Sequence, residues 1–142
     1  MNQSHATQRV SLPTAFEVSE RVSGPARVLC LRGELDIATA PTLRHRLAVA
    51  IRLRCDIVLD LSECDFMDCQ GLHTLLDVHG RLAKQRRCLL LAGVPPVIRR
   101  LLAATATDRT FARATTTQVA LARLHDPDTT SRAASLCLRA VA

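Results

Sequence analysis

The chain has 142 residues, enough for one domain that builds its own core without disulfides or metals. Apolar residues make up 48% of it but aromatic residues only 2%, so the core is expected to consist of Leu, Val, Ile and Ala. The net charge of +6 comes from scattered arginines with no aromatics interleaved for base stacking, and no run reaches the roughly 20 apolar residues of a membrane span, so neither nucleic-acid nor membrane binding is expected.

Two strands joined by a hairpin are predicted to follow a flexible lead at 1–13. Residues 15–18 alternate apolar and polar side chains, and 27–32 form a second apolar run, with Gly24-Pro25 as the turn between them. The polar segment 33–36 is expected to be a loop. A helix then begins near Thr39 as its N-cap, with a proline in the first turn.

The middle of the chain predicts a buried strand followed by an amphipathic helix. Residues 57–61 are apolar apart from Asp60, as in the centre of a parallel sheet covered on both faces. After a short polar loop, a helix is expected from about 69 to 85. Its predicted buried stripe consists of Leu72, Leu75, Leu76, Leu82 and Ala83. Three histidines are expected at the surface, namely His45, His79 and His125.

The last third of the chain predicts two further strand–helix pairs. A strand within 87–93 precedes a short helix from Pro95-Pro96, and a weak strand at 110–112 precedes a helix capped by Thr116 or Thr117. Residues 125–142 are expected to be a tail, with one extra short helix as the alternative. The fold class is therefore α/β: one domain at 14–124, with a mostly parallel, mixed sheet of four to five strands flanked by about four helices.

Two loops are predicted to share one functional edge. Glu34 and Asp36 follow the second strand, and 65–71 follows the third, so both loops lie at the carboxyl ends of neighbouring strands. The helix starting near Cys69 would present unpaired N–H groups there. Gly71 would keep the turn thin, so that a partner's backbone could approach closely.

Enzymatic and metal chemistry have little support in the sequence. Phosphate-binding glycine loops, nucleophile elbows and paired C-x-x-C motifs are absent. Cys64, Cys69 and His73 form the one cluster resembling a metal or thiol site, but a tetrahedral site needs a fourth ligand and a catalytic thiol needs a base. No catalytic residue, metal or cofactor is therefore expected. The six cysteines are expected to stay reduced in a cytoplasmic protein, since the polar start of the chain is no secretory signal.

The segment Arg32-Gly33-Glu34-Leu35-Asp36, the following Thr-Ala helix start, and Phe66 to Leu72 together resemble the STAS domain family. The closest branch is the bacterial anti-sigma factor antagonists, and the likeness runs from about Phe16 to Leu124. The resemblance implies a small sheet packed with helices. It also implies binding to an anti-sigma factor, usually a serine kinase of the GHKL type, which frees a sigma factor for transcription.

The resemblance also implies a phosphorylation switch that this chain lacks at the usual place. In the family's Asp-Ser-Ser-Gly motif, Asp68 matches the aspartate, Gly71 the glycine and Cys69 the first serine, whereas Gln70 takes the phosphorylated position. Gln has no hydroxyl to accept phosphate. The match implies a partner-binding surface made of the motif and an adjacent polar rim. Its residues are Glu34, Asp36, Thr39, Asp68, Cys69, Gln70, Gly71 and Leu72.

Two other interpretations stay open. The missing serine is compatible with a divergent STAS module that serves another regulatory or sensory complex. An enzyme or metal protein built on Cys69 and His73 is the third class, and elemental analysis of the purified chain would test it. Thr74 and Ser62, the nearest hydroxyls, are expected to make local hydrogen bonds.

Overall fold

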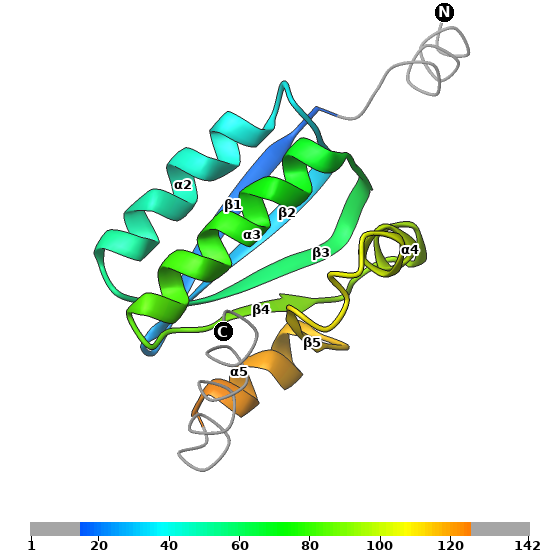
Figure 1. Cartoon of the computed structure of the whole chain (residues 1–142). Coiled ribbons are helices and arrows are strands. Elements are labelled where there is room, and N and C mark those ends of the chain that lie inside the picture. Colours follow the sequence, from blue (N-terminus) through cyan, green and yellow to red (C-terminus); the bar gives the residue numbers. More distant parts are fainter. Residues whose placement is uncertain (1–14, 126–142) are drawn as a thin grey trace, which may run out of the picture.

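The fold comes from a computed structural model, and the structure describes residues 15–125 (Figure 1). Strands and helices alternate through this range after an initial pair of strands. In chain order they are β1 (Glu17–Ser23), β2 (Ala26–Leu35), α2 (Ala40–Arg52), β3 (Asp56–Met67), α3 (Cys69–Lys84), β4 (Leu89–Ala92), α4 (Pro96–Ala104), β5 (Ala112–Ala114) and α5 (Thr117–His125).

The strands form one five-stranded mixed sheet in the order β1-β2-β3-β4-β5. β1 and β2 pair antiparallel around the turn at Gly24, which confirms the predicted hairpin. β2, β3, β4 and β5 pair parallel to one another, with β3 in the centre. The predicted α/β class and the central place of the third strand are both confirmed.

Alternating residues of the strands supply two separate cores. Leu29, Ile57, Leu59, Leu89 and Leu91 face the larger cluster, which also holds buried leucines of α2, α3 and α4. Figure 1 shows α2 and α3 side by side over this face. The opposite side of the strands forms a smaller cluster beneath α5, made of residues such as Val28, Val58, Leu90, Ala120 and Leu124. Helices on both faces explain why the central strands read as nearly continuous apolar runs.

β2 and β3 are longer than predicted, and the loops expected at 33–36 and before 69 are mostly strand. The two strands continue in parallel to the pairs Glu34↔Phe66 and Leu35↔Met67, with register shifts on the way. Only every second or third residue of this extension is buried, so its many polar residues concealed the strand. The chain passes from β3 to α3 through Asp68 alone.

Three smaller expectations also need correction. β5 begins two residues later than predicted, at Ala112. Leu76 is only partly buried at the rim of the core. His79 is buried at 3% exposure instead of lying at the surface, with its ring in edge-to-face contact with Phe111 at a centroid distance of 5.6 Å. The expected N-terminal lead and the C-terminal tail lie outside the described residues, apart from His125 at the end of α5.

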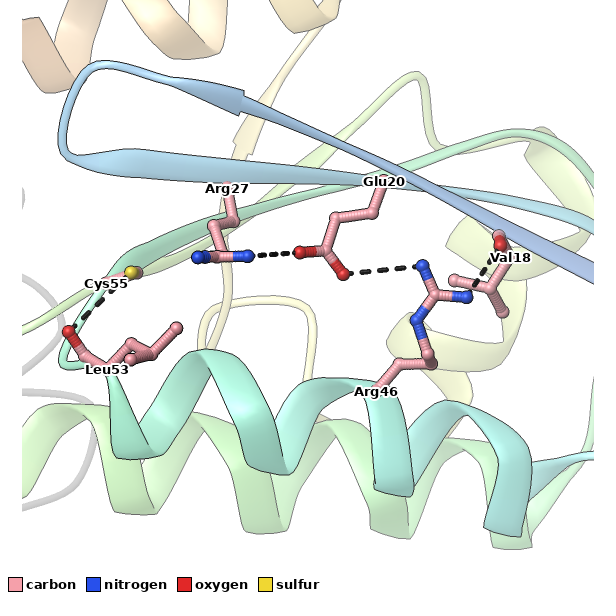
Figure 2. A network of polar contacts seen from close by, with 6 residues as sticks. All are labelled: Val18, Glu20, Arg27, Arg46, Leu53 and Cys55. Carbon is pink, nitrogen blue, oxygen red and sulfur yellow. Dashed lines mark hydrogen bonds and ion pairs between the residues drawn. The ribbon is translucent and has the colours of Figure 1, made fainter.

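The edge strand β1 is held to helix α2 by a three-residue ion-pair network (Figure 2). The Glu20 carboxylate lies between Arg27 of β2, which donates to one oxygen, and Arg46 of α2, which approaches the other at 3.4 Å. Arg46 also donates to the Val18 carbonyl at 3.0 Å. These bonds join β1, β2 and α2.

Candidate functional site

Asp68 joins the end of β2 to the start of α3. Its Oδ1 accepts a hydrogen bond from the Gly71 backbone N–H at 2.9 Å, which caps the helix. Its Oδ2 accepts from the Ile37 N–H at 3.1 Å, and its own N–H donates to the Leu35 carbonyl at 3.1 Å. The structure thus brings together the two predicted segments, and one carboxylate holds them in place.

Asp36 and Thr39 organise the loop between β2 and α2. The Asp36 carboxylate accepts from the N–H groups of Ala38 and Thr39, at 3.0 and 3.1 Å. The Thr39 hydroxyl donates to the Glu34 carbonyl at 2.7 Å and lies 2.9 Å from the Asp36 N–H. Thr39 is the N-cap residue of α2, but its side chain makes no cap hydrogen bond to the helix. Both residues are half-buried and act chiefly inside this loop.

Gly71 and Leu72 lie beneath the surface, not on it. Leu72 is 3% exposed, and Gly71 is buried against the end of β2. A Cβ at position 71 would come 2.8 Å from the Leu35 carbonyl oxygen and 2.9 Å from Met67 Cγ. The expectation that Gly71 leaves room for a partner is therefore wrong, because the backbone it accommodates is that of Leu35 in the same chain.

Five of the exposed residues at this place are called the α3 tip surface below: Glu34, Ile37, Phe66, Cys69 and Gln70. Ile37 and Phe66 were not predicted as site residues. They are large apolar side chains that are 70% and 43% exposed. The sequence did contain a signal, since Ile37 interrupts a polar segment and Phe66 is one of only three phenylalanines.

The hydroxyl nearest to Gln70 along α3 is buried. Thr74 is 0% exposed, and its Oγ1 donates to the Gln70 carbonyl at 3.0 Å while accepting from Arg44 of α2 at 3.0 Å. Ser62 is exposed but hydrogen-bonds to Asp60 through its hydroxyl at 2.7 Å. Both hydroxyls make the local bonds that the sequence analysis expected.

The cysteines near the tip differ in exposure. Cys64 is buried, its Sγ lies 3.4 Å from the Phe66 carbonyl oxygen, and burial raises the pKa of the thiol. Cys69 is exposed on α3, one turn before the exposed His73. Within residues 15–125, no group of three His, Cys, Asp or Glu side chains is placed to hold a metal ion.

The model of the STAS domain family matches residues 16–122. The chain belongs to the STAS domain family. The matched range runs from the residue before β1 into α5, so it includes every strand and the whole α3 tip surface. The family resemblance drawn from the two sequence motifs is confirmed.

Solved structures of anti-sigma factor antagonists share this fold. One from Mycobacterium paratuberculosis is 25% identical, with a TM-score of 0.73 over 81% of this chain and 100% of the other. A STAS domain protein from Planctomyces limnophilus is 18% identical (TM-score 0.69; 77% and 98% covered). The Bacillus cell fate determinant SpoIIAA in its phosphorylated form is 23% identical (TM-score 0.62; 78% and 100% covered). The last two establish similarity of fold alone.

Among the helices of residues 15–125, none combines the length and the apolar character needed to cross a bilayer.

Proposed function

We propose that this STAS domain is an anti-sigma factor antagonist: it binds an anti-sigma factor through the α3 tip surface and so releases a sigma factor for transcription. It acts by binding, not by catalysis, in the cytoplasm. The observation that carries the proposal is the exposure of Cys69 and Gln70 at the start of α3. Asp68, the residue just before them, is in contrast hydrogen-bonded within the chain. The matched family and its similarity to anti-sigma factor antagonists support the class of partner.

The α3 tip surface has the composition of a protein contact. Two exposed apolar side chains, Ile37 and Phe66, lie beside polar positions, and Glu34 pairs directly with Phe66 along the sheet. Protein interfaces commonly combine an apolar centre with a polar rim. The bonds of Asp68 and Asp36 hold this surface in one shape, so little conformational entropy is lost when a partner docks.

Gln70 makes this binding independent of phosphorylation at the usual position. A phosphate there would add roughly −1.5 to −2 charge two residues from the Asp68 carboxylate, and like-charge repulsion would expel a docked partner. Gln70 is neutral and cannot be phosphorylated, so a GHKL-type kinase partner would remain bound in the presence of ATP. SpoIIAA, in contrast, exists in unphosphorylated and phosphorylated forms.

Titration of Gln70→Glu with the anti-sigma factors of the source organism tests this proposal. The wild-type chain is expected to bind one of them, and Gln70→Glu to weaken that binding at least about tenfold, or about 1.4 kcal/mol. A carboxylate in the first turn of α3 is favourable for the helix, so thermal stability should not fall. A loss of binding therefore cannot come from unfolding.

Gln118→Glu is the matched control, because Gln118 is an exposed residue of α5, which packs on the other face of the sheet. It introduces the same charge and should leave the affinity unchanged. If no anti-sigma factor binds the wild-type chain, the proposed function is wrong. If Gln70→Glu and Gln118→Glu bind equally well, the α3 tip surface is not the interface.

A second variant, Gln70→Ser, restores an acceptor hydroxyl. Incubated with the bound anti-sigma kinase and ATP, it should gain one phosphate and dissociate, whereas the wild-type chain should remain unmodified and bound. Phosphate on the wild-type chain, for example at Ser62, would show that control by phosphorylation has moved to another site.

The presence of Gln70 where the family has a phosphorylated serine also favours a second candidate, a STAS module of another regulatory or sensory complex. Affinity capture with the wild-type chain separates the two. An anti-sigma factor in the eluate supports the first, and a sensory protein whose capture is lost in Gln70→Glu supports the second.

A further inference from the structure

A second candidate binding site lies where the strands β4 and β5 lead into the helices α4 and α5. There a hollow of about 440 Å³ opens just after the last residues of β4 and β5, at Gly93 and Thr115. The carboxyl ends of parallel strands are where open α/β sheets usually bind ligands. Figure 1 shows α4 and α5 on either side of this part of the sheet.

Three arginines from three different elements line this hollow. Arg99 comes from α4, Arg113 from β5 and Arg123 from α5, and none of the lining residues within 15–125 is acidic. The Arg123 guanidinium donates to the Arg113 carbonyl at 2.7 Å, which fixes it beside the end of β5. The Arg99 and Arg113 side chains make no hydrogen bond or ion pair with the part of the chain that the structure describes.

Two arginines that have no carboxylate partner within residues 15–125, around one concave site, favour an anion. Guanidinium groups match the geometry of phosphate oxygens with paired N–H donors. The volume of the hollow falls within the range of small-molecule sites, and its arginines converge on one place instead of forming a stripe along the surface. A compact ligand is therefore favoured over a long polyanion.

We propose that this hollow binds a small molecule carrying a phosphate or pyrophosphate group, held by Arg99 and Arg113. The site is separate from the α3 tip surface, because none of the tip residues lines it. The proposal does not depend on the proposed function, and its test requires no protein partner.

Titration of the full chain with pyrophosphate, inorganic phosphate and glucose 6-phosphate tests the site. Each ligand is added at constant ionic strength in sodium chloride, and the melting temperature and backbone amide NMR shifts are followed. A ligand that binds only the folded chain raises the melting temperature as its concentration exceeds the dissociation constant. We expect a saturable rise with at least one of the three ligands, with the largest shifts at the amides of Gly93 and Thr115.

Arg99→Ala/Arg113→Ala should weaken this binding at least about tenfold, whereas Arg100→Ala should leave it unchanged. Arg100 is the matched control, because it is an exposed neighbour of Arg99 on α4 that does not line the hollow. If the double variant does not fold, the single variants Arg99→Gln and Arg113→Gln should each show part of the loss. Tighter binding of glucose 6-phosphate would identify a phosphorylated metabolite, and equal binding of inorganic phosphate would identify the free ion.

Three results would overturn the proposal. The first is no saturable binding of any of the three ligands up to about 10 mM. The second is an equal loss in Arg100→Ala, which would indicate unspecific attraction to a basic protein. The third is binding of an acidic peptide such as oligoglutamate without binding of the phosphates, which would make the hollow a protein contact.

Discussion

Glycines and polar side chains have different surroundings in the first turn of α3 and in the body of the same helix. Gly71 is enclosed by Leu35 and Met67, whereas Gly80, two and a half turns later, has nothing within 4 Å of an added Cβ. Asp68 uses both carboxylate oxygens, whereas the buried His79 has no hydrogen-bond partner for either ring nitrogen among the described residues. The tightly enclosed glycine and the fully hydrogen-bonded carboxylate both lie at the first turn of α3, which belongs to the binding surface that we propose.

The difference follows from what the first turn and the body of α3 each contact. The first turn packs against backbone, since the Leu35 carbonyl accepts from Asp68 and also lies next to Gly71. The body packs through side chains such as Leu75, Val78 and Leu82, which can adjust to one another. A rigid backbone contact tolerates no added atom, whereas a side-chain contact tolerates a change of shape more readily.

The two glycines give the largest expected contrast. Gly71→Ala should destabilise the fold by about 2 kcal/mol, because its methyl group would meet the backbone of Leu35 at 2.8 Å. Gly80→Ala should stabilise it by about 0.5–1 kcal/mol, because alanine is the better helix former and the space is open. Urea unfolding of both variants measures the two effects. Equal changes in the two variants would mean that α3 does not approach β2 as described.

Two substitutions of Asp68 test the link between the loop after β2 and the start of α3, one removing more of its hydrogen bonds than the other. Asp68→Ala should cost about 1–2 kcal/mol of unfolding free energy, because it removes the helix cap and leaves the Ile37 N–H without its acceptor. Asp68→Asn should cost less, since one amide oxygen can still cap α3 but its NH₂ group cannot accept from Ile37.

Hydrogen exchange separates the two roles of Asp68. The Ile37 amide should exchange faster in both variants, and the Gly71 amide should remain protected in Asp68→Asn. An Ile37 amide that stays protected in Asp68→Ala would contradict the bond between the loop and the carboxylate.

Apolar periodicity was sufficient to predict most of the fold. The run 57–61 identified the central strand, and the helical spacing of Leu72, Leu75 and Leu82 identified α3, because burial on a regular element leaves a regular pattern. The same rule failed at the ends of β2 and β3. There, exposed side chains and register shifts replace the apolar pattern with one resembling a loop.

The candidate site was predicted in part for similar reasons. Asp68 was predicted as a site residue because it matches the aspartate of the family motif, and its role as a helix cap is local in sequence. The burial of Gly71 depends on Leu35, 36 positions earlier, and the hollow around Arg99 and Arg113 depends on three elements meeting. Such contacts between distant parts of the chain leave no local signal. His79 was misplaced because a histidine on an apolar helix face looks the same in sequence whether Phe111 covers it or not.

His79 gives the smallest expected effect, a loss of stability in acid. Burial lowers the pKa of its ring below the ordinary value of 6.5, because the charged form is disfavoured where no partner compensates it. Below pH 6.5 the unfolded chain therefore takes up the proton more readily than the folded chain. The contribution of His79 is fully present above pH 6.5 and is lost as the pH falls toward the lowered pKa.

Unfolding free energies measured between pH 7.5 and 5.5 should fall less steeply in His79→Leu than in the wild-type chain. His73→Gln, which changes an exposed histidine of the same helix and leaves His79 in place, should keep the wild-type slope. If His79→Leu keeps that slope as well, the ring is solvated in solution. The difference in hydrogen bonding between Asp68 and His79 would then disappear, and the contrast between the first turn and the body of α3 would rest on Gly71 and Gly80 alone.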